Sequence, residues 1–134
     1  MSTSITKILR VLIGVQIYRL YGLSLLQAPN LPSAFTLPVV TGDALTAVFA
    51  PVIAIAISMK RGPRTWAVAI VWNVLGMIDL FYALALGSLT GAASYILANN
   101  VLVLVGACLG IVLHVTAIIL LLRKSSVDYF LNRV

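Results

Sequence analysis

The sequence has very few acidic residues and no glutamate. Its 134 residues include three acids, and charged residues of both signs make up only 9% of the chain. Soluble proteins contain about 25% charged residues, because a water-facing surface needs them. Hydrophobic residues make up 62% of this chain. This composition excludes a water-soluble fold, and it equally excludes a disordered chain.

The sequence also lacks the residues of most metal, haem and disulfide sites. The single cysteine, Cys108, excludes an intrachain disulfide, and the single histidine, His114, excludes a haem held by two histidines. The two residues are six positions apart on different faces of a helix, so a shared metal is not expected. We therefore predict no metal and no cofactor. A nucleic-acid partner is not expected either, because no basic groove with interleaved aromatic residues is present.

Four continuous apolar segments approach or exceed the length of roughly 20 residues that a membrane span needs. Continuous runs predict helices rather than the alternating strands of a barrel. Residues 28–42 contain three prolines, so no helix is expected there. We predict an all-α membrane protein with one transmembrane domain over residues 1–134. It is expected to be a bundle of four helices with the bounds 8–27, 44–59, 66–86 and 95–122, followed by a short tail over 123–134.

The basic residues predict the orientation of these helices. Eight of the nine fall on the same side of the predicted membrane: Lys7, Arg10, Lys60, Arg61, Arg64, Arg123, Lys124 and Arg133. The positive-inside rule places that side in the cytoplasm. We therefore expect a multi-pass protein of the plasma (inner) membrane with both termini cytoplasmic and the lipid bilayer as its main partner.

The ninth basic residue, Arg19, lies inside the first predicted helix. A charge at that depth is costly, about 2.5–3.5 kcal/mol on insertion scales, and needs a partner. Asp79 in the third helix lies at a matching depth, since both residues are roughly 12–13 Å from the outer surface. Asp43, at the predicted start of the second helix, is also within reach of a long side chain or could cap that helix. The sequence leaves open whether Arg19 meets Asp79 or Asp43.

Polar and small residues recur at helical spacing in three of the four segments. The stripes are Gln16, Arg19 and Gly22; Asn73, Gly76, Asp79 and Tyr82; and Asn99, Gly106, Gly110 and His114. If these stripes face one another, they form a polar pocket in the outer half of the bundle. The candidate ligand-binding residues are Arg19, Asp79, Asp43, Asn73, Tyr82 and Asn99. The structural alternative is a locking ion pair, hydrogen bonds between helices and a packed His114.

Two motifs resemble those of a group of small four-helix bacterial integral membrane proteins without an established function. They are Gly42-Asp43 followed by Ala50-Pro51, and Trp72-Asn73-x-x-Gly76-x-x-Asp79-Leu80, with Leu113-His114 in the last helix. The resemblance covers residues 19–122 and singles out Asp43, Asn73, Asp79 and His114, but implies no activity. The chain is more loosely similar to small multidrug-resistance transporters. Those carry a membrane-embedded glutamate in their first helix, and this chain has none.

Three functions are compatible with these observations. The first is binding or transport of a small polar or lipophilic molecule, by a homodimer because four helices are few for a transport path. The second is an accessory or assembly subunit whose polar stripes are structural. The third is an intramembrane enzyme that uses Asp79 as an acid or base on a lipophilic substrate, so the question of enzymatic activity stays open. A cavity that reaches Arg19 and Asp79 would favour the first function, and complete pairing without a cavity would favour the second.

Overall fold

The chain is helical almost throughout the part that the structure describes. The structure is a computed structural model, and it describes residues 3–59 and 62–131. In chain order its elements are α1 (Thr3–Gly14), the 3₁₀ helix η1 (Val15–Gln27), α2 (Ser33–Met59), α3 (Pro63–Thr90), α4 (Ala92–Asn99), α5 (Val101–Leu122) and α6 (Lys124–Leu131). The stretches that are long and apolar enough to cross a membrane are Ile5–Gln27, Ser33–Met59, Pro63–Thr90 and Val101–Leu122. The predicted all-helical chain with four candidate spans is confirmed.

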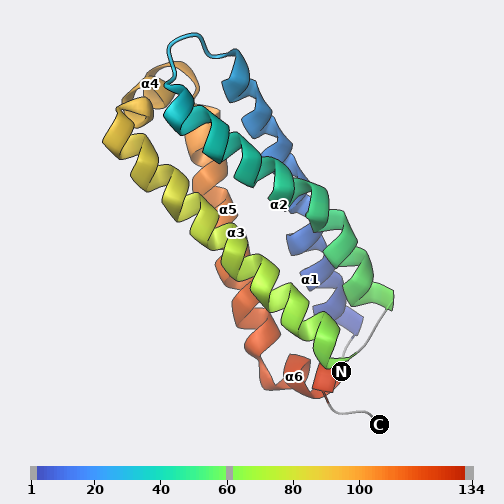
Figure 1. Ribbon diagram of the computed structural model, residues 1–134. Coiled ribbons are helices and arrows are strands. Elements are labelled where there is room, and N and C mark those ends of the chain that lie inside the picture. Colours follow the sequence, from blue (N-terminus) through green and yellow to red (C-terminus); the bar gives the residue numbers. More distant parts are fainter. Residues whose placement is uncertain (1–2, 60–61, 132–134) are drawn as a thin grey trace.

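The four long helical stretches lie side by side (Figure 1). The first stretch, α1 and η1, contacts α2 and α5, and α3 contacts the same two helices. The short helix α4 lies at one end of the molecule, and α6 lies at the other end, where α1 begins. We refer to these as the α4 end and the α6 end. The described basic residues Lys7, Arg10, Arg64, Arg123 and Lys124 belong to the α6 end, whereas Lys60, Arg61 and Arg133 lie outside the described residues.

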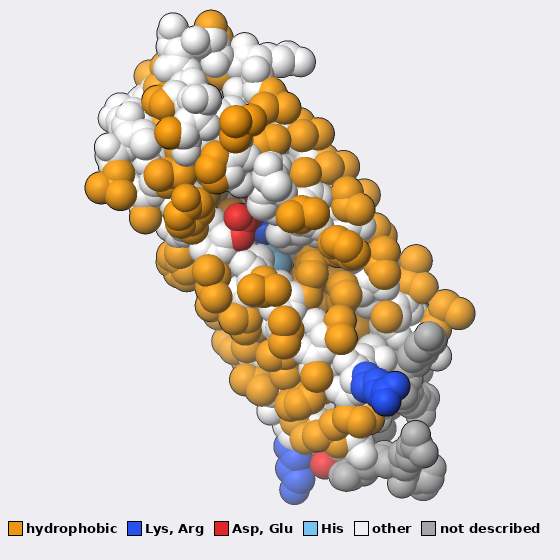
Figure 2. All heavy atoms as spheres, viewed as in Figure 1, with side chains coloured by type: hydrophobic (Ala, Val, Ile, Leu, Met, Phe, Trp, Pro, Cys, Tyr) orange, Lys and Arg blue, Asp and Glu red, His pale blue; other side chains and the backbone are white. Residues whose placement is uncertain are grey.

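The outward faces of the long helices are apolar. Figure 2 shows hydrophobic side chains along the face formed by α2 and α3, with basic side chains at the α6 end. Val48, Leu75 and Val112 are each more than half exposed on three different helices. Apolar side chains of this kind have no reason to face water, but they suit the hydrocarbon of a bilayer.

The second helix is longer than the sequence predicted. The expectation that residues 28–42 avoid helix is wrong from Ser33 onward, because α2 begins there. The carbonyl of Pro32 accepts hydrogen bonds from the backbone N–H groups of Phe35 and Thr36 and from the Thr36 hydroxyl, which starts the helix. Pro38 and Pro51 lie inside it. Prolines are tolerated in membrane helices, where neighbouring groups satisfy the freed backbone.

The last predicted helix, over 95–122, is in fact two helices. α4 ends at Asn99 and α5 begins at Val101, because Asn100 leaves the helical conformation with φ −151° and ψ 60°. α3 continues to Thr90, beyond its predicted end, and turns into α4 at Gly91. Gly91 has φ +73°, a conformation that is strained for residues with a side chain. The predicted tail is ordered as α6 up to Leu131, and residues 132–134 lie outside the described part.

Two separate groups of buried hydrophobic residues hold the helices together. The α6-end cluster is Leu9, Ile13, Ile53, Ile57, Ala69, Ala117, Leu121 and Phe130. The α4-end cluster is Leu25, Phe35, Val39, Val40, Ala92 and Ile96. Fully buried polar side chains lie in the stretch between them, among them Gln16, Asn73 and His114. This polar stretch is where the site described next is found.

Candidate functional site

Arg19 is placed inside the molecule by the winding of η1. This segment is a 3₁₀ helix of 13 residues, and such a helix makes one turn every three residues. Its buried residues are spaced by three and therefore lie on one face: Gln16, Arg19, Gly22 and Leu25. That face packs mainly against α2. As a result, Arg19 is only 3% exposed although it is the one charged residue of η1.

The guanidinium of Arg19 bridges two carboxylates from two other helices. Its Nε donates to Asp43 Oδ1 at 2.8 Å, and its Nη2 lies 2.6 Å from the same oxygen. Nη2 also donates to Asp79 Oδ2. The sequence left open which acid is the partner, and the structure shows that both are. Asp43 does not cap α2, because it lies ten residues after the helix begins.

Two glycines allow the carboxylates to approach neighbouring backbone. A Cβ atom added to Gly22 would lie 3.1 Å from Asp43 Cγ and closer still to its Oδ2. A Cβ atom added to Gly42 would overlap the carboxylate of Asp79. The Asp43 and Asp79 side chains stay 14% and 21% exposed, whereas the Arg19 side chain is 2% exposed. The cation is therefore enclosed, and the anionic partners are the more accessible part of this Arg19–Asp43–Asp79 cluster.

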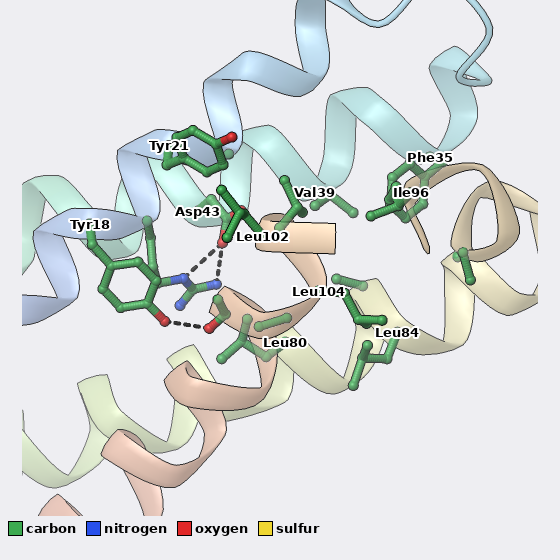
Figure 3. A pocket seen from close by; sticks show the side chains of 18 of the residues that line it. Tyr18, Tyr21, Phe35, Val39, Asp43, Leu80, Leu84, Ile96, Leu102 and Leu104 are labelled. Atoms are coloured by element: carbon green, nitrogen blue, oxygen red, sulfur yellow. Dashed lines mark hydrogen bonds and ion pairs between the residues drawn. The ribbon is translucent and has the colours of Figure 1, made fainter. Parts of the chain in front are cut away.

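A cavity of about 440 Å³ extends from this cluster toward the α4 end. Figure 3 shows its two ends: Tyr18 and Asp43 lie at one, and Phe35 and Ile96 lie at the other. Its wall includes aliphatic side chains from three helices: Val39, Leu80, Leu84, Leu102 and Leu104. Arg19 and Asp43 are the charged residues among those that line the cavity. Asp79 is not a lining residue, but it accepts a hydrogen bond from Arg19, which is.

Tyrosine hydroxyls fasten η1 to the wall of this cavity. Tyr18 donates to the backbone carbonyl of Gly106 at 2.6 Å. Tyr21 donates to Asn100 Oδ1 at 3.2 Å, at the break between α4 and α5. Both rings line the cavity. Gly106 and Gly110 face Tyr18 inside the molecule, so the glycine face of α5 packs internally.

Three of the predicted site residues lie away from the cavity. Asn73 is buried and bonds His114, its Oδ1 lying 3.0 Å from the Nδ1 atom of the histidine. Asn99 is exposed, and its amide donates to the carbonyl of Tyr95 in its own helix. Tyr82 is 51% exposed on the outer face of α3. The structure therefore brings together Arg19, Asp43 and Asp79, and it does not bring Asn73, Asn99 or Tyr82 to them.

The cavity residues of α2 were missed because the sequence predicted no helix before residue 44. Phe35 and Val39 line the cavity together with Asp43. The spacing of four between these residues is the signal that could have found them, since positions i, i+4 and i+8 share a helix face. Three prolines and a glycine in residues 28–42 hid that signal.

A family model described as "Domain of unknown function (DUF8737)" matches residues 1–122 of the chain. No curated protein and no solved structure matches it significantly. The match covers all four candidate spans and every residue of the Arg19–Asp43–Asp79 cluster.

Proposed function

The chain belongs to the DUF8737 family, and we propose that it is a multi-pass membrane protein that binds a small amphipathic molecule. The observation that carries this proposal is the cavity of about 440 Å³, which has charged groups at one end and hydrocarbon along its walls. Small-molecule sites commonly measure about 300–1,000 Å³ and combine apolar walls with a few polar groups. A ligand would place its polar end near Asp43 and its apolar part between Phe35 and Leu104.

The charges of the cluster favour a ligand with one positive charge, such as an amine. Two carboxylates share one guanidinium, so the three ionised groups carry one negative charge in excess. An unbalanced charge in apolar surroundings is costly and must be neutralised by a proton or a cation. The carboxylate of Asp43 is the more exposed of the two charged groups lining the cavity. A cationic group would therefore meet the side of the cluster that lacks a counter-charge.

The orientation that we propose for the membrane puts the cavity in its outer half. The four spans form a bundle, and the α6 end, which carries the described basic flanks, faces the cytoplasm of the plasma (inner) membrane. Both termini are then cytoplasmic. The cavity extends toward the opposite, α4 end. A lipophilic amine would enter it from the outer side or from the outer leaflet.

The alternative of an accessory or assembly subunit is favoured by one observation, the pairing of Arg19 with both carboxylates. A purely structural cluster needs no adjoining cavity, however, and one is present. The glycine face of α5 also packs within the chain, where Gly110 lies against Leu80 and Tyr18. An acid–base enzyme would need a free carboxyl group at Asp79, and Arg19 donates to that group. Ligand binding is therefore the function that the geometry supports best.

A matched series of three small molecules tests the proposal. We would add 4-phenylbutylamine, 4-phenylbutanol or 4-phenylbutyrate to purified protein in detergent and measure the thermal unfolding temperature, which rises when a ligand binds the folded state. The amine is expected to raise it most. Asp43→Asn should abolish that rise, and Tyr82→Phe, a change outside the cavity, should preserve it. No rise with any of the three, or a rise only with the carboxylate, would contradict the proposal.

A further inference from the structure

A second group of polar side chains lies next to the Arg19–Asp43–Asp79 cluster, on the side of the α6 end. Gln16, Asn73 and His114 are each 0% exposed. Four of the buried polar atoms in and beside this group have no hydrogen-bond partner: Gln16 Oε1, Gln16 Nε2, His114 Nε2 and Arg19 Nη1. Buried polar groups are nearly always satisfied by protein or by ordered water. This concentration of unpaired atoms in one region therefore needs an occupant.

The hydrogen bonds of Asn73 determine the tautomer of His114. The Nδ2 of Asn73 donates to the backbone carbonyl of Ala69 at 2.8 Å, which leaves its Oδ1 as the acceptor that faces His114. The Nδ1 atom of His114 must then carry the proton. In the neutral ring, Nε2 keeps a free lone pair, and that atom is buried without a donor. The edge-on packing of Trp72 against the ring, with centroids 5.3 Å apart, holds this orientation.

The register of the helices puts Gln16 and His114 at the same height along the helix axes. The His114 ring packs on Gly76, which lies one helical turn, about 4.5 Å, from Asp79 along α3. Gln16 lies one 3₁₀ turn, about 6 Å, from Arg19 along the same face of η1. Since Arg19 bonds Asp79, both residues lie one turn beyond the cluster on the side of the α6 end.

Small side chains surround this level. A Cβ atom added to Gly14 would lie 3.7 Å from that of Ala54 on α2, and α2 buries Ala47 and Ala50 a few residues closer to Asp43. On α3, Gly76 makes space for the His114 ring, since a Cβ atom there would overlap it. Small neighbours and several buried polar atoms without partners are typical of an internal water site rather than of a dry core.

We propose that ordered water occupies the space between Gln16, Arg19 and His114. The water donates to His114 Nε2 and accepts from Arg19 Nη1, and the amide of Gln16 completes its hydrogen bonds. This buried water site extends the polar interior from the ligand cavity to the middle of the membrane. It ends at the α6-end cluster, where Ile13, Ile57 and Leu121 are fully buried. The site does not depend on the proposed ligand, because none of its unpaired atoms except that of Arg19 belongs to a cavity residue.

The single histidine of the chain makes this proposal directly testable. Protein labelled with ¹⁵N-histidine, placed in lipid bilayers at neutral pH, gives one imidazole in the NMR spectrum. We expect a protonated Nδ1, an unprotonated Nε2, and transfer of magnetisation from water to the ring. A dry ring, or a proton on Nε2, would overturn the proposal. A direct hydrogen bond from the Gln16 amide to Nε2 without water contact would overturn it as well.

A matched pair of glutamine variants controls for general disturbance. Gln16→Met removes the amide at similar volume, and Gln27→Met makes the same change at an exposed position of η1. Gln16→Met should weaken the water signal at His114 and lower the thermal unfolding temperature by roughly 3–6 °C, because it removes partners of the water. Gln27→Met should change neither. A rise in the unfolding temperature of Gln16→Met would show that the amide is simply unpaired, and would overturn the proposal.

Discussion

Two helices of this protein carry candidate site residues in a series with a spacing of three. The two series differ in which of their residues are buried. On η1 the residues at this spacing, from Gln16 through Arg19 and Gly22 to Leu25, are all buried. On α3 the equivalent series starts buried at Asn73 and Gly76, but it ends at Tyr82, which is 51% exposed. The two series share a spacing but differ in the winding of their helices.

The winding explains the difference. An α-helix has 3.6 residues per turn, so nine residues make two and a half turns and bring Tyr82 to the side opposite Asn73. A 3₁₀ helix has three residues per turn, so the η1 series stays on one face. Such helices are uncommon at this length, and η1 is held by what its buried face contacts. Arg19 joins η1 to α2 and α3 through the two carboxylates. Residues spaced by three therefore stay on one face only where the helix has three residues per turn.

Removing the arginine at the centre of the η1 series should have the largest effect. Arg19→Gln leaves two largely buried carboxylates without a cation, and loss of one partner of a buried pair costs about 3–5 kcal/mol. The free energy of unfolding, measured by titration with sodium dodecyl sulfate in mixed micelles, should fall by that amount. Arg10→Gln, at an exposed position of α1, is the matched control and should change it little. Equal effects of the two substitutions would show that the cluster does not hold η1.

The next effect depends on how many carboxylates are removed. Asp43→Asn or Asp79→Asn alone leaves one cation with one anion, so we expect a change of at most about 1 kcal/mol in the unfolding free energy. The double variant leaves Arg19 buried without an anion, and it should lose about 3–5 kcal/mol. Each variant can be measured by the same titration. If either single variant lost as much as the double, the excess negative charge inferred for the cluster would be wrong.

A smaller loss is expected from filling the space beside η1. The Cβ atom of Gly22→Ala would force the Asp43 carboxylate away from Arg19, and overpacking of this kind costs about 1–3 kcal/mol. Gly14→Ala adds the same atom to the preceding helix, where it meets only Ala54 Cβ at an ordinary 3.7 Å. It should be neutral or slightly stabilising, because alanine favours helix over glycine. Thermal unfolding of the two variants compares them directly, and a loss at Gly14 alone would reverse the expected order.

Much of the fold could be predicted from composition and hydropathy. Four spans follow from apolar run length alone, because a bilayer imposes that length on any spanning helix. The energetic cost of a charge inside the membrane also predicted that Arg19 would pair with an acidic residue. The start of α2 could not be predicted, since local rules give Pro38 a helix-breaking role that apolar surroundings override.

The site was predictable only in part for a related reason. Arg19, Asp43 and Asp79 stood out because charges are rare in this chain, whereas Phe35, Val39 and Leu104 are ordinary apolar residues that only tertiary structure brings to one cavity. Asn73 and Tyr82 were placed with Asp79 by spacing, and the α-helical drift then separates them. The 3₁₀ winding of η1 has no sequence signal that we recognise, although it decides which side of the first span faces inward.

The smallest expected difference is between two tyrosines, one from each of the two helices compared above. Tyr18→Phe removes the hydroxyl that donates to the Gly106 carbonyl and so fastens η1 to α5, which should cost about 0.5–1.5 kcal/mol of unfolding free energy. Tyr82→Phe removes a hydroxyl from an exposed face of α3 and should stay within about 0.5 kcal/mol of wild type. The denaturant titration of both variants measures the gap. A larger loss at Tyr82 would mean that another molecule in the membrane binds the outer face of α3. Tyr82 would then belong to a contact surface and would not simply face lipid.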